Sequence, residues 1–212
     1  LVSLGDSEMF IAKFDNLGNC IWAKQSSGVS EVQGNSLSAD LNGNVFVTGY
    51  FRGNATFGST TLVCAGYTDL FIAKYDNSGN FLWVKQAGGE TALTKGVDVV
   101  TDINGNCYVL GDFVGLITFG GTHQIYSAHF DSRDLFLAKY DNFGNFISVR
   151  QISYPGECNA GGIALDITGN IYVTGSMPFE FHFEESILIT KLDSSFNLLW
   201  ENQAGSVTID RG

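Results

Sequence analysis

The chain has 212 residues, and its 22 acidic and 11 basic side chains give it a formal net charge of −11. Such a surface repels nucleic-acid phosphates and anionic lipid headgroups, so we expect no nucleic-acid partner and no docking on a charged membrane. Every apolar stretch is well short of the roughly 18 residues that a membrane span needs, so we also expect no membrane insertion.

One sequence motif returns four times along the chain, and its first copy reads FIAKFDNLGNCIWAKQ. The copies occupy Phe10–Gln25, Phe71–Gln86, Phe136–Gln151 and Leu188–Gln203. The last copy, LITKLDSSFNLLWENQ, is the most altered. Self-similarity at a fixed period is typical of repeat architectures, so we expect the chain to be an array of one structural unit.

A second motif alternates with the first, and its first copy reads SLSADLNGNVFVTGYF. The copies occupy Ser36–Phe51, Val97–Phe113 and Ile163–Ser176. Gly49 and Gly111 are 62 positions apart, and Gly111 and Gly175 are 64 apart. The complete unit therefore contains both motifs.

Nearly every copy of either motif has a D-x-x-G-N turn at its centre. The aspartate bonds to the backbone two residues further on, and glycine supplies the positive φ that closes a tight turn. Each unit is therefore expected to be four antiparallel strands in up-and-down order. Residues 163–166 and 171–174 illustrate the first two strands, and residues 71–76 and 81–86 the last two.

The third strand of the unit predicts how the sheets are arranged. In FIAKY it is apolar on both faces at Phe71, Ile72, Ala73 and Tyr75. A sheet with one wet face alternates more strictly, whereas a sheet between two similar sheets does not. Stacked four-stranded sheets around an axis make a β-propeller. The fold class is therefore an all-β propeller.

Tryptophans at one position of the fourth strand are expected to wedge between adjacent blades. They are Trp22, Trp83 and Trp200, and Ser148 holds the place in the remaining copy. The serine predicts a weaker contact there. The expected division is a half blade at 1–33, full blades at 34–89, 96–152 and 160–205, and the start of another repeat at 206–212.

About three and a half blades are fewer than the four to eight that usually close a propeller. An open arc would leave an apolar sheet face at each end, and such faces are sticky. We therefore expect further blades of the same chain, in a ring of six to eight, or a second copy that closes the ring.

The combined pattern D-x-F-[IL]-A-K-x-D-x-x-G-N-x-x-W and G-I-x-x-D-x-x-G-N-x-Y-V-T-G resembles the bacterial β-propeller repeat called SBBP, and its hairpin half is similar to NHL repeats. The resemblance covers nearly the whole chain. It implies blades of large secreted or cell-surface bacterial proteins, many of them similar to cargo of the type IX secretion route. It brings no common catalytic residues.

The four cysteines are separated too widely for a zinc or thioredoxin-type motif. Cys20 and Cys107 hold places taken by apolar residues in other copies, so both are expected in the core. Cys64 and Cys158 lie in variable loops, where a disulfide between them is an alternative to two free thiols.

No residue is assigned to catalysis, a cofactor or a metal. Calcium at the D-x-x-G-N turns is an alternative to a purely structural role, but the spacing does not match an EF-hand loop. Glu180, His182 and Glu184 share one face of an extended segment and could bind a metal, although solvated charges on an edge strand are favoured. His123 and His129 are interpreted as surface residues.

A uniform scaffold with divergent loops favours a non-enzymatic binding module, extracellular or on a cell surface, with a protein or glycan partner. The loops Arg52–Tyr67 and Gly115–Arg133 vary most between copies and are the expected contact elements. The alternative is a glycan hydrolase or lyase with its site at the channel mouth. Its inner-strand candidates, Asp40, Asp102 and Asp166, are repeated turn residues, which argues against it.

Overall fold

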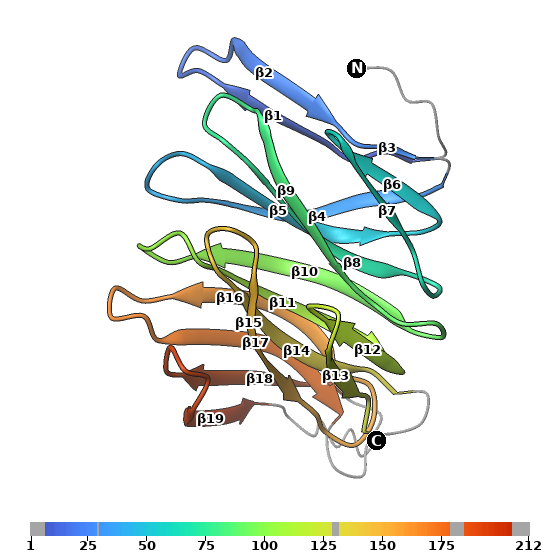
Figure 1. Cartoon of the computed structure of the whole chain (residues 1–212). Coiled ribbons are helices and arrows are strands. Elements are labelled where there is room, and N and C mark those ends of the chain that lie inside the picture. Colours follow the sequence, from blue (N-terminus) through green and yellow to red (C-terminus); the bar gives the residue numbers. More distant parts are fainter. Residues whose placement is uncertain (1–6, 29, 129–131, 179–184, 205–212) are drawn as a thin grey trace, which may run out of the picture.

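The computed structural model describes residues 7–28, 30–128, 132–178 and 185–204, and these form antiparallel sheets without helices. Figure 1 shows the sheets following one another from the blue N-terminal pair to the red C-terminal sheet. No helix among these residues could cross a membrane. The all-β propeller class predicted from the sequence is confirmed.

Four sheets, here called blades I to IV, make up this stack. Blade I contains β1 (Phe10–Phe14) and β2 (Cys20–Gln25). Blade II contains β4 (Val32–Ala39), β5 (Val45–Phe51), β8 (Asp69–Tyr75) and β9 (Phe81–Ala87). Blade III contains β10 (Leu93–Thr101), β11 (Cys107–Val114), β14 (Asp134–Tyr140) and β15 (Phe146–Ile152). Blade IV contains β16 (Asn159–Leu165), β17 (Ile171–Pro178), β18 (Glu185–Leu192) and β19 (Leu198–Ala204).

The apolar core lies between the blades, in three clusters, one for each pair of neighbours. Strand β8 explains how one sequence serves two clusters. Its residues Phe71, Ala73 and Tyr75 face blade I, whereas Leu70 and Ile72 face blade III. All seven residues of β8 are buried. The strand that is apolar on both faces therefore lies between two sheets, as the sequence predicted.

The two variable loops contain short hairpins, which the sequence did not predict. They are formed by β6 (Asn54–Phe57) with β7 (Thr60–Val63) and by β12 (Leu116–Phe119) with β13 (His123–Tyr126). Strand β6 pairs with β3 (Ser27–Gly28), and Thr118 of β12 pairs with Gly88, the residue that follows β9. Each hairpin thus binds the backbone that leaves the preceding blade.

The hairpins also add to the core. Phe57 and Phe119 are completely buried, and both rings lie against aromatic side chains of their own blades. Each of these phenylalanines stands directly before a turn glycine, and its ring packs in the core. The loops Arg52–Tyr67 and Gly115–Arg133 are partly fixed to the scaffold.

Candidate functional site

Seven turns of one geometry lie along one edge of the stacked blades, where neighbouring strands are joined. They begin with the aspartates Asp15, Asp40, Asp76, Asp102, Asp141, Asp166 and Asp193. In Asp76–Asn80, the Asp76 Oδ1 accepts the backbone N–H groups of Ser78 and Asn80 at 2.9 and 2.8 Å. Oδ2 accepts the Asn80 side-chain amide at 2.8 Å. The pattern recurs in each turn, so each carboxylate is bound to its own turn.

These bonds favour the charged form of Asp76, Asp166 and Asp193. The Asn80 side-chain amide is the main cause that lowers the pKa of Asp76, and Asn197 does the same for Asp193. For Asp166 the first cause of the lowered pKa is the Thr168 hydroxyl. A carboxylate whose oxygens already accept turn donors is a poor ligand for calcium, so the geometry supports the structural interpretation of the turns.

Side chains of one blade bind these turns on the next blade. We call this contact, made by a tryptophan and a lysine, the lock. The Trp22 indole Nε1 of blade I donates to the Asn77 carbonyl oxygen of blade II at 3.1 Å. Lys13 Nζ, which lies opposite Trp22 across the β1–β2 ladder, binds the Asn77 carbonyl oxygen at 3.4 Å and also its carboxamide oxygen. The tryptophan therefore wedges against the next blade, as predicted.

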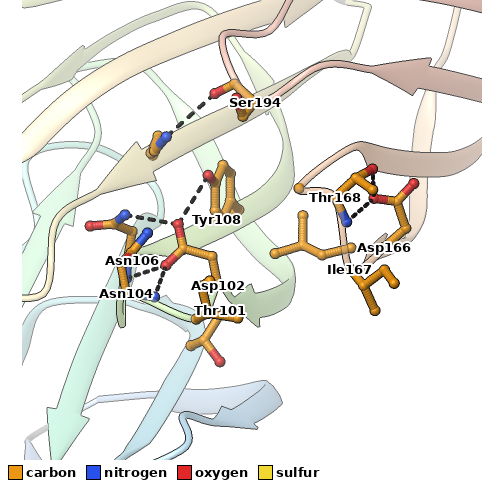
Figure 2. Close-up of a pocket in the computed structure, with 13 residues that line it drawn as sticks. Thr101, Asp102, Asn104, Asn106, Tyr108, Asp166, Ile167, Thr168 and Ser194 are labelled. Atoms are coloured by element: carbon orange, nitrogen blue, oxygen red, sulfur yellow. Dashed lines mark hydrogen bonds between the residues drawn. The ribbon is translucent and has the colours of Figure 1, made fainter.

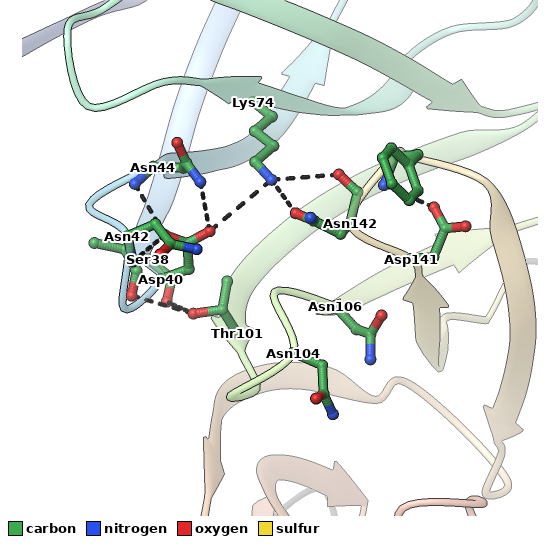
Figure 3. A network of polar contacts seen from close by, with 12 residues as sticks. Ser38, Asp40, Asn42, Asn44, Lys74, Thr101, Asn104, Asn106, Asp141 and Asn142 are labelled. Carbon is green, nitrogen blue, oxygen red and sulfur yellow. Dashed lines mark hydrogen bonds and ion pairs between the residues drawn. The ribbon is translucent and has the colours of Figure 1, made fainter.

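The same lock joins blades II and III. Trp83 Nε1 donates to the Asn142 carbonyl oxygen at 3.2 Å, and Lys74 Nζ binds the same oxygen at 3.3 Å and the Asn142 carboxamide oxygen. Figure 3 shows Lys74 extended between Asn142 and Asp40, whose carboxylate lies 3.9 Å from Nζ. Burial lowers the pKa of Lys74, while the charge of Asp40 acts in the opposite direction.

The interface of blades III and IV is built differently. Ser148 replaces the tryptophan, and Phe196 replaces the turn glycine with a φ of 68°. The Phe196 ring is buried and meets Tyr108 edge-on with centroids 6.1 Å apart. Arg150 Nη1 donates to the Phe196 carbonyl oxygen at 2.7 Å. The sequence predicted the missing tryptophan contact but not these replacements.

A cavity of about 490 Å³ lies in this same interface. Figure 2 shows it between the turn that begins at Asp102 and the turn that begins at Asp166, with Tyr108 on one wall. Lys139 and Ser194 also line the cavity, and Lys139 Nζ donates to the Ser194 carbonyl oxygen at 3.3 Å. The cavity thus mixes charged, polar and apolar walls.

The opposite edge of the stacked blades carries a second cavity, of about 320 Å³. Its lining includes Tyr67 from one variable loop and Leu116 and Tyr126 from the other. All three side chains are exposed. We call this group the tyrosine face. The two loops that the sequence singled out as contact elements therefore meet at one surface.

Several single residues test the sequence-based expectations. Cys107 is completely buried, as predicted, whereas the expectation for Cys20 is wrong because this side chain is exposed. Cys20 points to the side of blade I that no sheet covers in the described part of the chain. Cys64 and Cys158 are free thiols. His123 lies in β13 with its ring 5.5 Å from that of Phe146.

Other candidates lie elsewhere. Glu180, His182, Glu184 and His129 fall outside the described residues. The inner-strand carboxylates Asp40, Asp102 and Asp166 each bind their own turn. Sequence reasoning missed the lysines of the lock, although a lysine recurs at one position of all four copies. That recurrence in an apolar strand was the signal that could have found them.

The stacked blades and their locks define the class of β-propeller repeat proteins. Three segments, residues 21–50, 82–112 and 149–176, match the beta-propeller repeat SBBP. Each matched segment begins in the last strand of one blade and ends in the second strand of the next. Three segments of the chain are thus similar to this repeat, and the SBBP resemblance seen in its motifs is confirmed.

Two individual proteins are similar to parts of the chain. An uncharacterized WD repeat-containing protein of Acanthamoeba polyphaga mimivirus is 31% identical over 121 residues, or 53% of this chain and 9% of that protein. The chain thus spans about a tenth of its length. A lignostilbene dioxygenase from Pseudomonas brassicacearum is similar with a TM-score of 0.44 and 16% identity, over 77% of this chain and 36% of that structure. At that distance nothing about its chemistry transfers.

Proposed function

We propose that the chain is a non-enzymatic scaffold that binds a protein partner, outside the cell or at the cell surface. The observation that carries this proposal is the tyrosine face, where Tyr67, Leu116 and Tyr126 are exposed around one cavity. Tyrosine offers a large, rigid contact area with a polar tip and is enriched in protein interfaces. The secreted context rests on the SBBP resemblance.

The backbone beneath the tyrosine face is fixed, which suits a binding surface. The Tyr67 backbone N–H donates to the Ala92 carbonyl oxygen at 3.0 Å. At the other loop, the Gly115 N–H donates to the Ser127 hydroxyl at 2.9 Å, and the Ser127 N–H returns a bond to the Gly115 carbonyl at 3.1 Å. A partner therefore meets side chains on ordered backbone, and little conformational entropy is lost on binding.

The experiment compares the chain with its Tyr67→Ala/Tyr126→Ala variant. Each is immobilised and offered secreted and surface proteins of the source cells, and captured proteins are identified by mass spectrometry. Any candidate partner is then purified and its dissociation constant is measured with both chains. We expect a loss of binding of at least about tenfold, because central interface tyrosines contribute about 2 kcal/mol each.

The matched control is Phe143→Ala, which removes another exposed aromatic ring from a turn on the opposite edge of the stacked blades. This variant should bind the partner as the parent chain does. Equal binding by the double variant and the parent would contradict the proposal, and an equal loss in the control would show that the effect is not local.

We also propose that further blades of this repeat pack on the outer sheet faces of blades I and IV. In blade IV, Ile187 and Ile189 are 56% and 37% exposed, whereas the equivalent Leu70 and Ile72 of blade II are 0% exposed. In blade I, Phe10 and Phe14 are exposed, although their equivalents in blades II and III are buried. The two end faces are thus the two halves of an ordinary interface between blades.

The intact mass of the native polypeptide and its sedimentation in solution test this assignment. Further blades in one polypeptide give a larger mass, and a closing second copy gives a dimer. A native chain of this length that stays monomeric at high concentration would contradict the assignment of these faces, and it would leave the tyrosine-face proposal standing.

A further inference from the structure

The interface of blades III and IV also differs from the other two at the second position of the turn. In those two this residue is an asparagine, Asn77 or Asn142, which fills the space between the lysine of the preceding blade and the neighbouring turn of its own blade. A methyl group placed on Gly105 would come within 2.9 Å of Asn142 Oδ1, and one on Gly43 within 2.9 Å of the Asn77 carboxamide carbon. The asparagines therefore leave no room for a methyl group beside either glycine.

In the third interface the position is Ser194, and the space stays open. A methyl group on Gly169 would be 3.9 Å from the nearest atom, Ser194 Cβ. The cavity of about 490 Å³ lies at this point. Its volume falls in the range of about 300–1,000 Å³ that is usual for small-molecule sites. The substitution of serine for asparagine explains why the cavity forms here.

The substitution also removes the carboxamide oxygen that binds the equivalent lysines, and Lys139 contacts the Ser194 carbonyl and the Tyr108 side chain instead. Lys13 and Lys74 each bind a carboxamide oxygen in addition to the turn carbonyl. Lys139 Nζ binds the Ser194 carbonyl at 3.3 Å and lies 4.9 Å from the centre of the Tyr108 ring. It is also half-buried, whereas Lys74 is 2% exposed. An ammonium group in such a position favours an added oxygen acceptor.

The walls indicate which acceptor fits. Asp102 and Asp166 line the cavity, so a carboxylate or phosphate ligand would meet like charge, whereas a neutral carbonyl would not. A metal ion is also disfavoured because the oxygens of both aspartates accept turn donors. Ile103 and Ile167 are exposed and offer apolar surface for a methyl group.

We propose that this cavity binds the acetamido group of an N-acetylated sugar. The acetamido carbonyl takes the place of the missing asparagine carboxamide and accepts from Lys139 Nζ, while its methyl group packs on Ile103 and Ile167. The cavity is larger than one carboxamide, and Thr101 and Asn104 on its wall suit the ring hydroxyls. The site lies on the edge of the stacked blades opposite the tyrosine face. This proposal does not depend on the proposal for the tyrosine face.

The test titrates the chain with N-acetylglucosamine and with glucose, which differs by the acetamido group, and follows binding by calorimetry and by protein NMR. We expect N-acetylglucosamine to bind at least tenfold more tightly than glucose. Ser194→Asn should fill the cavity and weaken binding at least tenfold. Ser195→Asn, the same change one position further along the turn, should leave binding unchanged. Lys139→Met, which keeps the length of the side chain, should weaken binding without lowering the melting temperature as much as a core substitution would.

Three results would overturn the proposal. Equal affinity for both sugars would show that the acetamido group is not recognised. Unchanged binding in Ser194→Asn, with the variant folded by circular dichroism, would show that the ligand sits elsewhere. Equal or tighter binding of N-acetylasparagine amide would assign the cavity to a protein side chain instead of a sugar.

Discussion

The indole ring of Trp83 lies against Gly144 of the next blade, so closely that a methyl group on Gly144 would come within 2.8 Å of the ring. The adjacent Trp83 Nε1 donates to the Asn142 carbonyl oxygen at 3.2 Å. Trp22 and Gly79 repeat this relationship one blade earlier. A ring on one blade and a bare backbone on the next thus form one contact.

Replacing Trp83 with alanine should destabilise the chain by about 2–4 kcal/mol, because a partly buried tryptophan loses its packing on Phe46 and its hydrogen bond. The free energy of unfolding from urea denaturation measures this change. Trp200→Ala removes a tryptophan that lies on the outer blade and should cost less than 1 kcal/mol. Equal losses in the two variants would show that the contact with the next blade has no particular weight.

A double-mutant cycle can test the exchange seen between blades III and IV. Gly144→Phe alone should be destabilising, because the residue has a φ of 79° and the ring would collide with Trp83. Adding Trp83→Ser recreates the Ser148 and Phe196 pair and should restore part of the loss, with a coupling energy of about 1–3 kcal/mol.

The cycle is measured by the unfolding free energies of the parent chain, both single variants and the double variant. A sum of the single effects that equals the double effect would mean that tryptophan and turn residue do not interact. A coupling energy of the expected size would show that Ser148 and Phe196 together replace the tryptophan and glycine of the other two interfaces.

Acid should destabilise the fold through its turns. The bonds from Asn80 and Asn197 lower the pKa of Asp76 and Asp193 in the folded chain. The unfolded chain, with aspartate pKa values near about 3.9, then binds more protons at low pH, so the free energy of unfolding falls as the pH drops below about 4. Urea denaturation between pH 2 and 6 measures this slope.

Asp193→Asn cannot titrate at this position and should flatten the slope, while losing stability near pH 7. Parallel curves for the variant and the parent chain would show that the turn carboxylate carries none of the acid sensitivity.

The open face of blade IV should tolerate charge that an internal interface rejects. Ile189→Lys is expected to change the stability of the isolated chain by less than about 0.5 kcal/mol and to improve its solubility. Ile72→Lys, the same substitution at the equivalent buried position, should cost at least about 3 kcal/mol because it buries an unpaired charge. Similar losses in both variants would mean that blade IV is covered.

The fold could be predicted because its signals are local. The aspartate and glycine of each turn determine a hairpin, and the adjacent apolar residues Phe71 and Ile72 require a sheet on either side. The wedge position of Trp22 and Trp83 also follows from the repeat. These features depend on a few neighbouring residues and on the period of the array.

The features that were missed depend on contacts between distant residues. Lys74 is polar within an apolar strand, and only the next blade shows that its partner is Asn142, 68 positions further along. The hairpin with the buried Phe57 is not evident from the sequence, because the short strand β3 that binds it follows the preceding blade. Cys20 was expected to be buried because its equivalents are, but its own blade has an uncovered side in the described residues.

The cavity beside Ser194 was not predicted either. A serine in place of an asparagine is an ordinary change in an exposed turn. The resulting cavity becomes evident only when the three interfaces are compared in the structure. The asparagine of the other two interfaces contacts a lysine of the preceding blade and lies beside a glycine of another turn.

Because Trp83 and Gly144 belong to successive repeats, neither repeat contains the whole lock. A gene duplication or deletion that moves one unit therefore preserves this contact only if the new junction joins a tryptophan to a glycine, or a serine to a bulky residue. The pair of Ser148 and Phe196 restricts which unit can stand before blade IV. The order of repeats in such a gene is thus constrained at its junctions, even though the units look interchangeable.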